Sequence, residues 1–126
     1  METPEFIVVM SPDATTLRGL RRALAASGFD VEAALDWIET ISALRRRPVL
    51  LLVADLDEFS SDDLDRVRRL HAEFPRVGII ALVSLATPAV CAAERAGVVR
   101  AILEKPIALA RLEETVRAAL AWTTSP

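Results

Sequence analysis

The chain of 126 residues has one cysteine, one histidine and no tyrosine. Cys91 alone cannot form an internal disulfide, and a chain of this length buries enough apolar surface to fold without a disulfide or a structural metal. No apolar run approaches the roughly 20 residues that cross a bilayer, and no basic start leads into an apolar targeting segment. We therefore expect one soluble, cytoplasmic domain that does not contact membranes.

Lysine is also almost absent. Of the 15 basic residues only Lys105 is a lysine, and 18 acidic residues leave a net charge of −3. Proteins that coat nucleic acid need an excess of positive charge facing the phosphates, so we expect no direct nucleic-acid binding by this domain. The single lysine raises the question of which role requires it.

Short apolar runs alternate with longer stretches that have helical apolar spacing. Each run is typical of a strand buried on both faces, and each stretch of a helix packed on a sheet. The five runs cover residues 7–10, 29–33, 49–53, 77–83 and 98–103. This alternation predicts an α/β fold with three α/β/α layers around a five-stranded parallel sheet. We expect one domain over residues 1–122, followed by a tail or the start of a linker at 123–126.

Charged residues stand at the carboxyl ends of two predicted strands, where open parallel sheets bind their ligands. The third strand ends in Asp55, and Lys105 follows the fifth. A carboxylate at the end of so apolar a strand needs solvent or an opposite charge, so Lys105 is its expected partner. Two interpretations follow from the residues alone: a structural ion pair, or an anion or phosphoryl site with a nucleophilic carboxylate and a lysine.

The sequence around these two residues resembles a known family. Val-Ala-Asp-Leu-Asp at 53–57, Leu-Glu-Lys-Pro at 103–106 and the order of the elements resemble the receiver domain of two-component response regulators, over residues 6–120. The resemblance implies the flavodoxin-like (βα)5 fold of CheY and a non-enzymatic signalling domain. It also implies that Asp55 accepts a phosphoryl group from a histidine kinase or a phosphotransfer protein, in a phosphorelay.

The same resemblance implies roles for further residues. Lys105 would pair with the phosphoryl oxygens, and Pro106 would follow a cis peptide bond. Asp55 and the backbone carbonyl of Asp57 would hold Mg²⁺, with Asp13 as a further candidate ligand.

Two positions would make the switch that responds to the phosphoryl group. Ser84 matches the hydroxyl residue at the end of the fourth strand, and Ile102 stands where receivers usually have an aromatic residue. The fourth helix, fifth strand and fifth helix would form the contact face, including that of a homodimer.

The sequence departs from the family at the metal site. Receivers carry two adjacent acidic residues after the first strand, where this chain has Ser11 and Pro12, with Asp13 one step beyond. A full site sets three carboxylates against one lysine, a net charge of about −2 that Mg²⁺ cancels, whereas Asp55 and Lys105 sum to zero. Two hypotheses follow: Asp55 is phosphorylated, or the domain is a pseudo-receiver that acts through phosphorylation-independent protein–protein interaction.

A third hypothesis is a small enzyme or a flavin-binding module on the same architecture. The segment 11–16 after the first strand contains no glycine, so it matches neither a Gly-x-Gly-x-x-Gly motif nor a P-loop. His71 and Cys91 fall in different predicted helices, away from the strand ends. The sequence therefore offers this hypothesis no support.

Overall fold

The structure, a computed structural model, describes residues 6–124, with side chains as far as Ala121. Strands and helices alternate in the order β1 Phe6–Met10, α1 Ala14–Ala26, β2 Asp30–Ala34, α2 Trp37–Arg46, β3 Val49–Asp57, α3 Ser61–Glu73, β4 Gly78–Val83, α4 Pro88–Arg95, β5 Ala101–Glu104 and α5 Leu109–Thr124. The five strands form one parallel sheet in the order β2-β1-β3-β4-β5. The predicted α/β fold with a five-stranded parallel sheet is confirmed.

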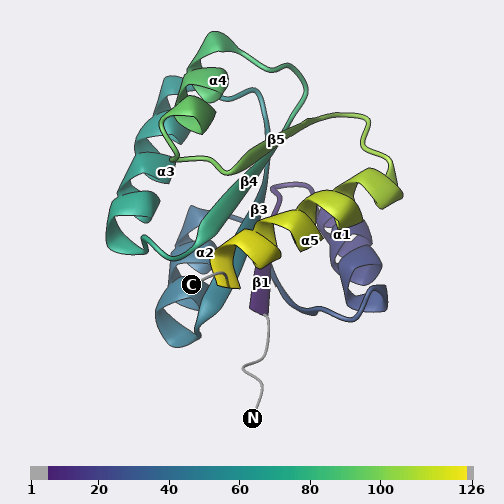
Figure 1. Ribbon diagram of the computed structural model, residues 1–126. Helices are drawn as coiled ribbons and strands as arrows, with labels where there is room; N and C mark the ends of the chain where they lie inside the picture. The colour runs from purple at the N-terminus through teal and green to yellow at the C-terminus, as the bar shows by residue number, and fades with distance from the viewer. Residues whose placement is uncertain (1–5, 125–126) are drawn as a thin grey trace.

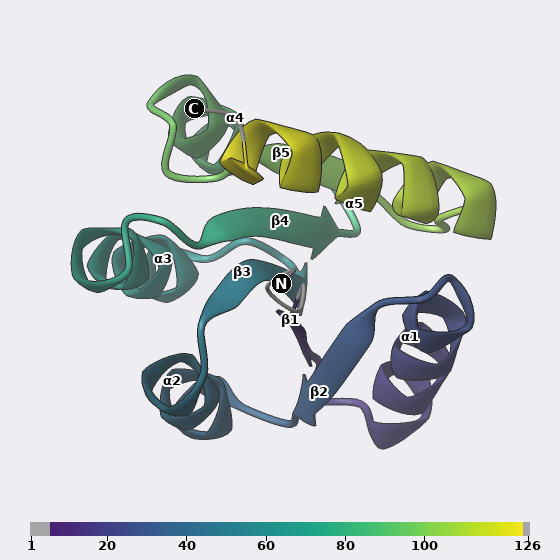
Figure 2. The same ribbon diagram turned by 60° about the horizontal axis from the view of Figure 1, so that its bottom comes forward.

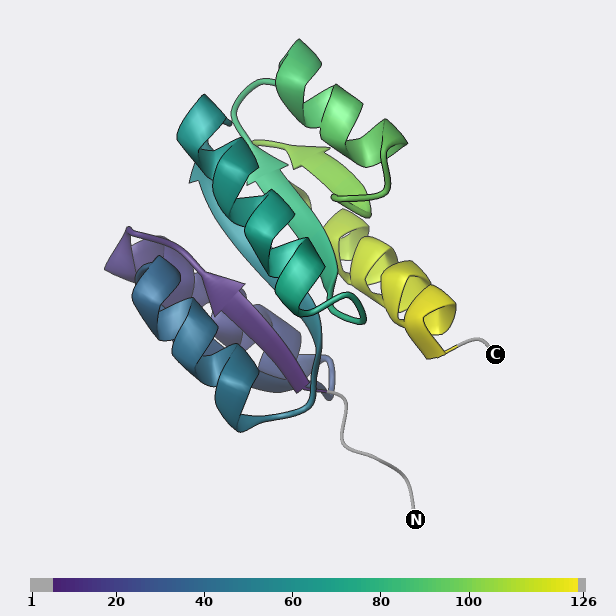
Figure 3. The ribbon, with the colours of Figure 1, turned by 90° about the vertical axis from the view of Figure 1, so that its left-hand side faces the viewer.

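Helices cover both faces of this sheet (Figure 1). Helices α1 and α5 pack on one face and α2, α3 and α4 on the other, as the turned view in Figure 2 makes clear. Figure 3 looks onto the face that α2, α3 and α4 cover. The sheet therefore lies between two helical layers, which is the three-layer arrangement that the sequence predicts.

The position of β3 in the middle of the sheet explains why its sequence is a continuous apolar run. Successive side chains of a strand point to opposite faces, so both faces of β3 need apolar residues. Leu52 and Ala54 pack in the core beneath α2, α3 and α4, whereas Leu51 and Val53 pack beneath α1 and α5. All four side chains are fully buried.

The edge strand β5 is shorter than predicted, since it begins at Ala101 and not at Val98. The backbone N–H groups of Val98 and Val99 donate to the carbonyl of Ala93, at 3.0 and 3.2 Å, and so extend the end of α4. These amides are therefore not free to pair with β4. The first backbone hydrogen bond to β4 comes from Arg100, whose N–H donates to the carbonyl of Ile79 at 2.7 Å, and the paired residues begin with Ala101 opposite Ile80.

At its carboxyl end β3 is longer than predicted, and its pairing with β4 shifts register between Asp55 and Asp57. At the end of the chain α5 reaches Thr124, two residues into the predicted tail, and residues 125–126 lie outside the described part. Within residues 6–124, no helix has the length and apolar character that a membrane span requires.

Candidate functional site at the strand ends

The carboxyl ends of four neighbouring strands bring the predicted site residues together. Ser11 follows β1, Asp55 lies near the end of β3, Ser84 follows β4 and Lys105 follows β5. Because the strands are parallel and adjacent, residues far apart in the sequence meet at one edge of the sheet. We call Ser11, Asp55, Asp57, Ser84 and Lys105 the strand-end site.

Asp55 is the buried centre of this site, with 5% of its surface exposed. Its Oδ2 accepts a hydrogen bond of 2.7 Å from the Ser11 hydroxyl, and its Oδ1 pairs with the ammonium of Lys105. A buried carboxylate is tolerated when it is both paired and hydrogen-bonded, and Asp55 meets both conditions. No buried side-chain nitrogen or oxygen in the described part of the chain lacks a partner.

Ser11 stands at one of the two positions where receivers carry an acidic residue. It is completely buried, and its backbone N–H donates to the carbonyl of Ala34 in β2 at 3.1 Å. Its Oγ accepts the backbone N–H of Asp13 at 3.2 Å. Since a hydroxyl has a single proton to donate, the short contact to Asp55 fixes the direction of that proton.

Lys105 contacts two carboxylates, those of Asp55 and Asp57. Burial by itself lowers the pKa of this ammonium, but the hydrogen bonds and the charges of Asp55 and Asp57 outweigh burial and raise the pKa above 10.5. The lone lysine of the chain is therefore fully charged at neutral pH. The Lys105–Pro106 peptide bond that follows is cis.

The contact of the Asp57 side chain with Lys105 did not follow from the sequence, which assigned only the backbone carbonyl of Asp57 a role. That carbonyl accepts the backbone N–H of Ser84 at 2.6 Å, where the β3–β4 register shifts. Asp57 has a φ of +47°, a left-handed conformation that aspartate tolerates better than most residues. Its carboxylate thereby reaches the lysine, with Asp57 Oδ1 also 3.5 Å from Ser84 Oγ.

Asp13, the further candidate for a metal ligand, caps α1. Its carboxylate accepts the backbone N–H and the hydroxyl of Thr16, and these hydrogen bonds lower the pKa of Asp13. The side chains of residues 6–121 form no group of three or more His, Cys, Asp or Glu residues that could hold a metal ion. The two carboxylates that remain, Asp55 and Asp57, share Lys105, so the residues present do not fit the acidic site that Mg²⁺ prefers.

The two predicted switch positions differ in their surroundings. Ser84 is exposed, and its backbone is tied to Asp57, whereas Val83 before it is fully buried. Ile102 is half-buried against the core beneath α4. It also lines a groove of about 550 Å³ beside β5, together with Cys91, Glu94, Pro106, Ile107 and Arg111.

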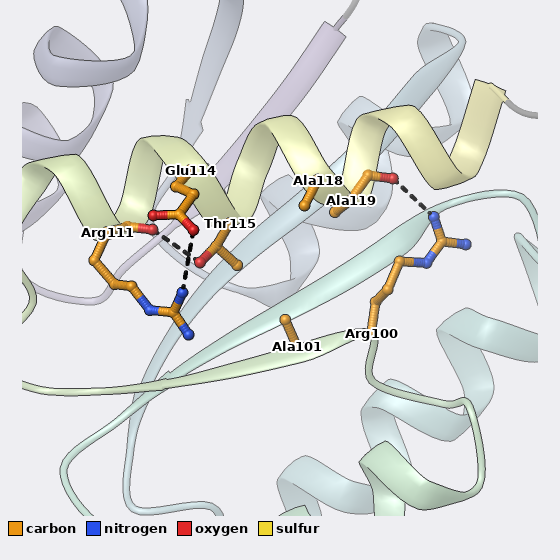
Figure 4. A pocket seen from close by; sticks show the side chains of 7 residues that line it. All are labelled: Arg100, Ala101, Arg111, Glu114, Thr115, Ala118 and Ala119. Carbon is orange, nitrogen blue, oxygen red and sulfur yellow. Dashed lines mark hydrogen bonds and ion pairs between the residues drawn. The ribbon is translucent and has the colours of Figure 1, made fainter.

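A second hollow, of about 230 Å³, lies between β5 and α5 (Figure 4). Its charged groups are engaged locally: Arg111 lies 3.8 Å from Glu114, and the guanidinium of Arg100 donates to the carbonyl of Ala119 at 3.3 Å. The hydroxyl of Thr115 donates to the carbonyl of Arg111 at 2.8 Å. Of these contacts, only that of Arg100 joins α5 to the segment before β5, since the other two lie within α5. The chemistry-bearing residues lie elsewhere, at the strand-end site.

Comparisons with known proteins bear on the fold. No protein-family model matches the chain, and no curated protein does. Among solved structures, a CheY-like response regulator receiver domain protein from Methanospirillum hungatei has a TM-score of 0.85 at 17% identity, covering 96% of this chain and 97% of its own.

Two other structures are similar to the same extent. The signal receiver domain of an HD-domain-containing protein from Pseudomonas fluorescens has a TM-score of 0.85 at 20% identity, covering 98% of this chain and 100% of its own. A putative pilus assembly-related protein from Burkholderia pseudomallei has a TM-score of 0.82 at 22% identity, covering 97% and 92%. The chain therefore has the CheY-like receiver fold over nearly its whole length.

Proposed function

We propose that the chain is a receiver-type signalling module that acts through protein–protein contact and does not require phosphorylation of Asp55. One observation carries this proposal: both carboxylate oxygens of Asp55 already have partners, Ser11 and Lys105. The pseudo-receiver hypothesis is thus the one that the geometry favours.

The charge at the strand-end site supports the same conclusion. Two carboxylates, Asp55 and Asp57, face the single ammonium of Lys105, so the group carries a net charge of −1. Phosphoryl transfer needs positive charge around the transferring group, supplied in most sites by a metal and a cation. Here the one cation is shared between two anions, and Asp13 is turned to Thr16. A phosphoryl group on Asp55 would be poorly neutralised.

Phosphorylation of Asp55 is the second candidate function, and a specific observation favours it too. Asp55, Lys105 and Ser84 converge at one edge of the sheet, in the arrangement that the resemblance implies for a phosphoacceptor, its lysine and its switch hydroxyl. On this alternative a histidine kinase or a phosphotransfer protein is the partner, and a metal would have to be recruited to a site with few carboxylates.

The contact face that we propose consists of α4, β5 and α5. The groove beside β5 runs between these elements, and half-buried Ile102 and Ile107 contribute apolar surface to it. Leu109 at the start of α5 is 53% exposed. The groove combines the apolar side chains of Ile102 and Ile107 with the charged side chains of Glu94, Glu104 and Arg111. Such a mixed surface suits a second copy of the chain or another signalling protein.

The function is tested by incubating the protein with a small phosphodonor, with and without Mg²⁺, and measuring its intact mass. We expect no gain of a phosphoryl group, under conditions that label a receiver with a complete acidic pair. A Mg²⁺-dependent gain that disappears in Asp55→Asn would reject the proposal in favour of the second candidate.

A further inference from the structure

The strand-end site contains a second carboxylate, that of Asp57, which also pairs with Lys105. We infer that the Asp57 carboxylate is a tethered competitor that occupies the oxyanion position beside Lys105 and weakens the binding of phosphate-like ligands there. This inference rests on the proposed function, because it explains how the site remains complete without a phosphoryl group.

The Asp57 carboxylate contacts the same hydrogen-bond donors that a bound oxyanion would use. An oxyanion beside Asp55 can find an ammonium at Lys105 and a hydroxyl at Ser84. The Asp57 carboxylate pairs with that ammonium, and its Oδ1 lies 3.5 Å from the hydroxyl, at the long limit for a hydrogen bond. The same carboxylate oxygen therefore faces both donors.

The backbone holds the competitor in place and leaves its side chain free to move. The left-handed φ of Asp57 and the 2.6 Å bond from Ser84 N–H to the Asp57 carbonyl fix the main chain. The Asp57 side chain itself has 68% of its surface exposed, against 4% for that of Asp55. An external anion can thus displace Asp57 into solvent, whereas Asp55 cannot leave.

Two effects make the competition work against an external oxyanion. A tethered carboxylate is present at a high effective concentration, in the millimolar range for short flexible links, so a free anion must exceed it. A bound phosphate would also lie next to the negative charge of Asp57, and like charges at contact distance repel. Removal of the Asp57 charge removes both effects.

The test is a titration with inorganic phosphate, followed through the ammonium signal of Lys105 in protein labelled with ¹⁵N-lysine. Because the chain has one lysine, the spectrum holds one side-chain signal to follow. Asp57→Asn is the informative variant, since asparagine keeps the size and accepts the left-handed backbone. Glu58→Gln is the matched control: the same charge is removed one residue away, at an exposed side chain.

We expect Asp57→Asn to bind phosphate about two- to fivefold more tightly than the wild type, the range that loss of an exposed ion pair gives. Glu58→Gln should bind like the wild type. Equal affinity in Asp57→Asn and the wild type, or an equal gain in Glu58→Gln, would overturn the inference. The two experiments reject different statements. The mass experiment asks whether Asp55 of the wild type becomes phosphorylated, and the phosphate titration asks whether Asp57 competes with a bound anion.

Discussion

Ser11 shows how one hydroxyl alters the chemistry of a carboxylate. A carboxylate at this position would repel Asp55 and draw in a metal ion, whereas the serine hydroxyl donates to Asp55 Oδ2 and needs no metal. The exchange of an acceptor for a donor therefore changes what the unmodified site requires. In the unmodified domain Asp55 is hydrogen-bonded to Ser11 and paired with Lys105.

Loss of this hydroxyl should destabilise the fold. Ser11→Ala removes the donor from a buried charged acceptor, and hydrogen bonds to charged groups contribute about 1.5–3 kcal/mol. We expect urea unfolding to show a loss in that range, with an unchanged m-value. Ser84→Ala, which removes an exposed hydroxyl, is the control and should stay within about 0.5 kcal/mol of the wild type. A loss in Ser11→Ala as small as the control would contradict the role assigned to Ser11.

The pKa of Lys105 reports how strongly the carboxylates of Asp55 and Asp57 stabilise the charged ammonium. The folded pKa of Lys105 lies above its ordinary value of 10.5, so its contribution to stability is complete below that pH and is lost as the pH rises through the folded pKa. We expect an NMR titration to find the raised pKa in the wild type, and a lower pKa in Asp55→Asn and in Asp57→Asn. A wild-type pKa at or below 10.5, unchanged in both variants, would show that the ion pairs do not form.

At the scale of elements, the start of β4 shows how packing constrains a strand. A Cβ atom on Gly78 would lie 2.8 Å from the Leu51 side chain of β3 and 3.0 Å from the guanidinium of Arg100. The strand can therefore approach its neighbours closely only because this residue has no side chain.

Two glycine substitutions test this point against each other. Gly78→Ala should destabilise the protein by about 1–3 kcal/mol, because Leu51 or the strand must move. Gly19→Ala lies in the middle of α1 with open space around it, and alanine in a helix should stabilise by about 0.5–1 kcal/mol. Thermal unfolding of both variants distinguishes the two effects. A stabilising Gly78→Ala would show that β3 and β4 are less closely packed than described.

The elements themselves were largely predictable, because apolar runs and helical spacing report burial directly. The same pattern could not give the start of β5, since Val98 is partly buried and Val99 fully buried, yet the backbone N–H groups of both donate to the carbonyl of Ala93. It also could not give the contact of Asp57 with Lys105, which depends on a register shift and a left-handed φ. Hydrophobic periodicity is blind to both kinds of backbone detail.

At the scale of the whole molecule, the arginine-rich composition serves the fold as well as the surface. Arg45 at the end of α2 pairs with Glu73 of α3 at 3.0 Å, and Arg46 and Arg47 pair with Glu32 of β2. These ion pairs join neighbouring elements around one face of the sheet. The single lysine, Lys105, lies where a compact ammonium pairs with two carboxylates.

On the proposed function, Ser11 and Lys105 fully satisfy Asp55, and the strand-end site needs neither a phosphoryl group nor a metal ion. The ammonium signal of Lys105 in ¹⁵N-lysine-labelled protein tests it most directly, because it reports on the single lysine of the chain. We predict a signal that is protected from solvent exchange, is lost or strongly shifted in Asp55→Asn, and does not change when Mg²⁺ is added. A signal that is unchanged in Asp55→Asn, or one that shifts when Mg²⁺ is added to the wild type, would contradict this proposal.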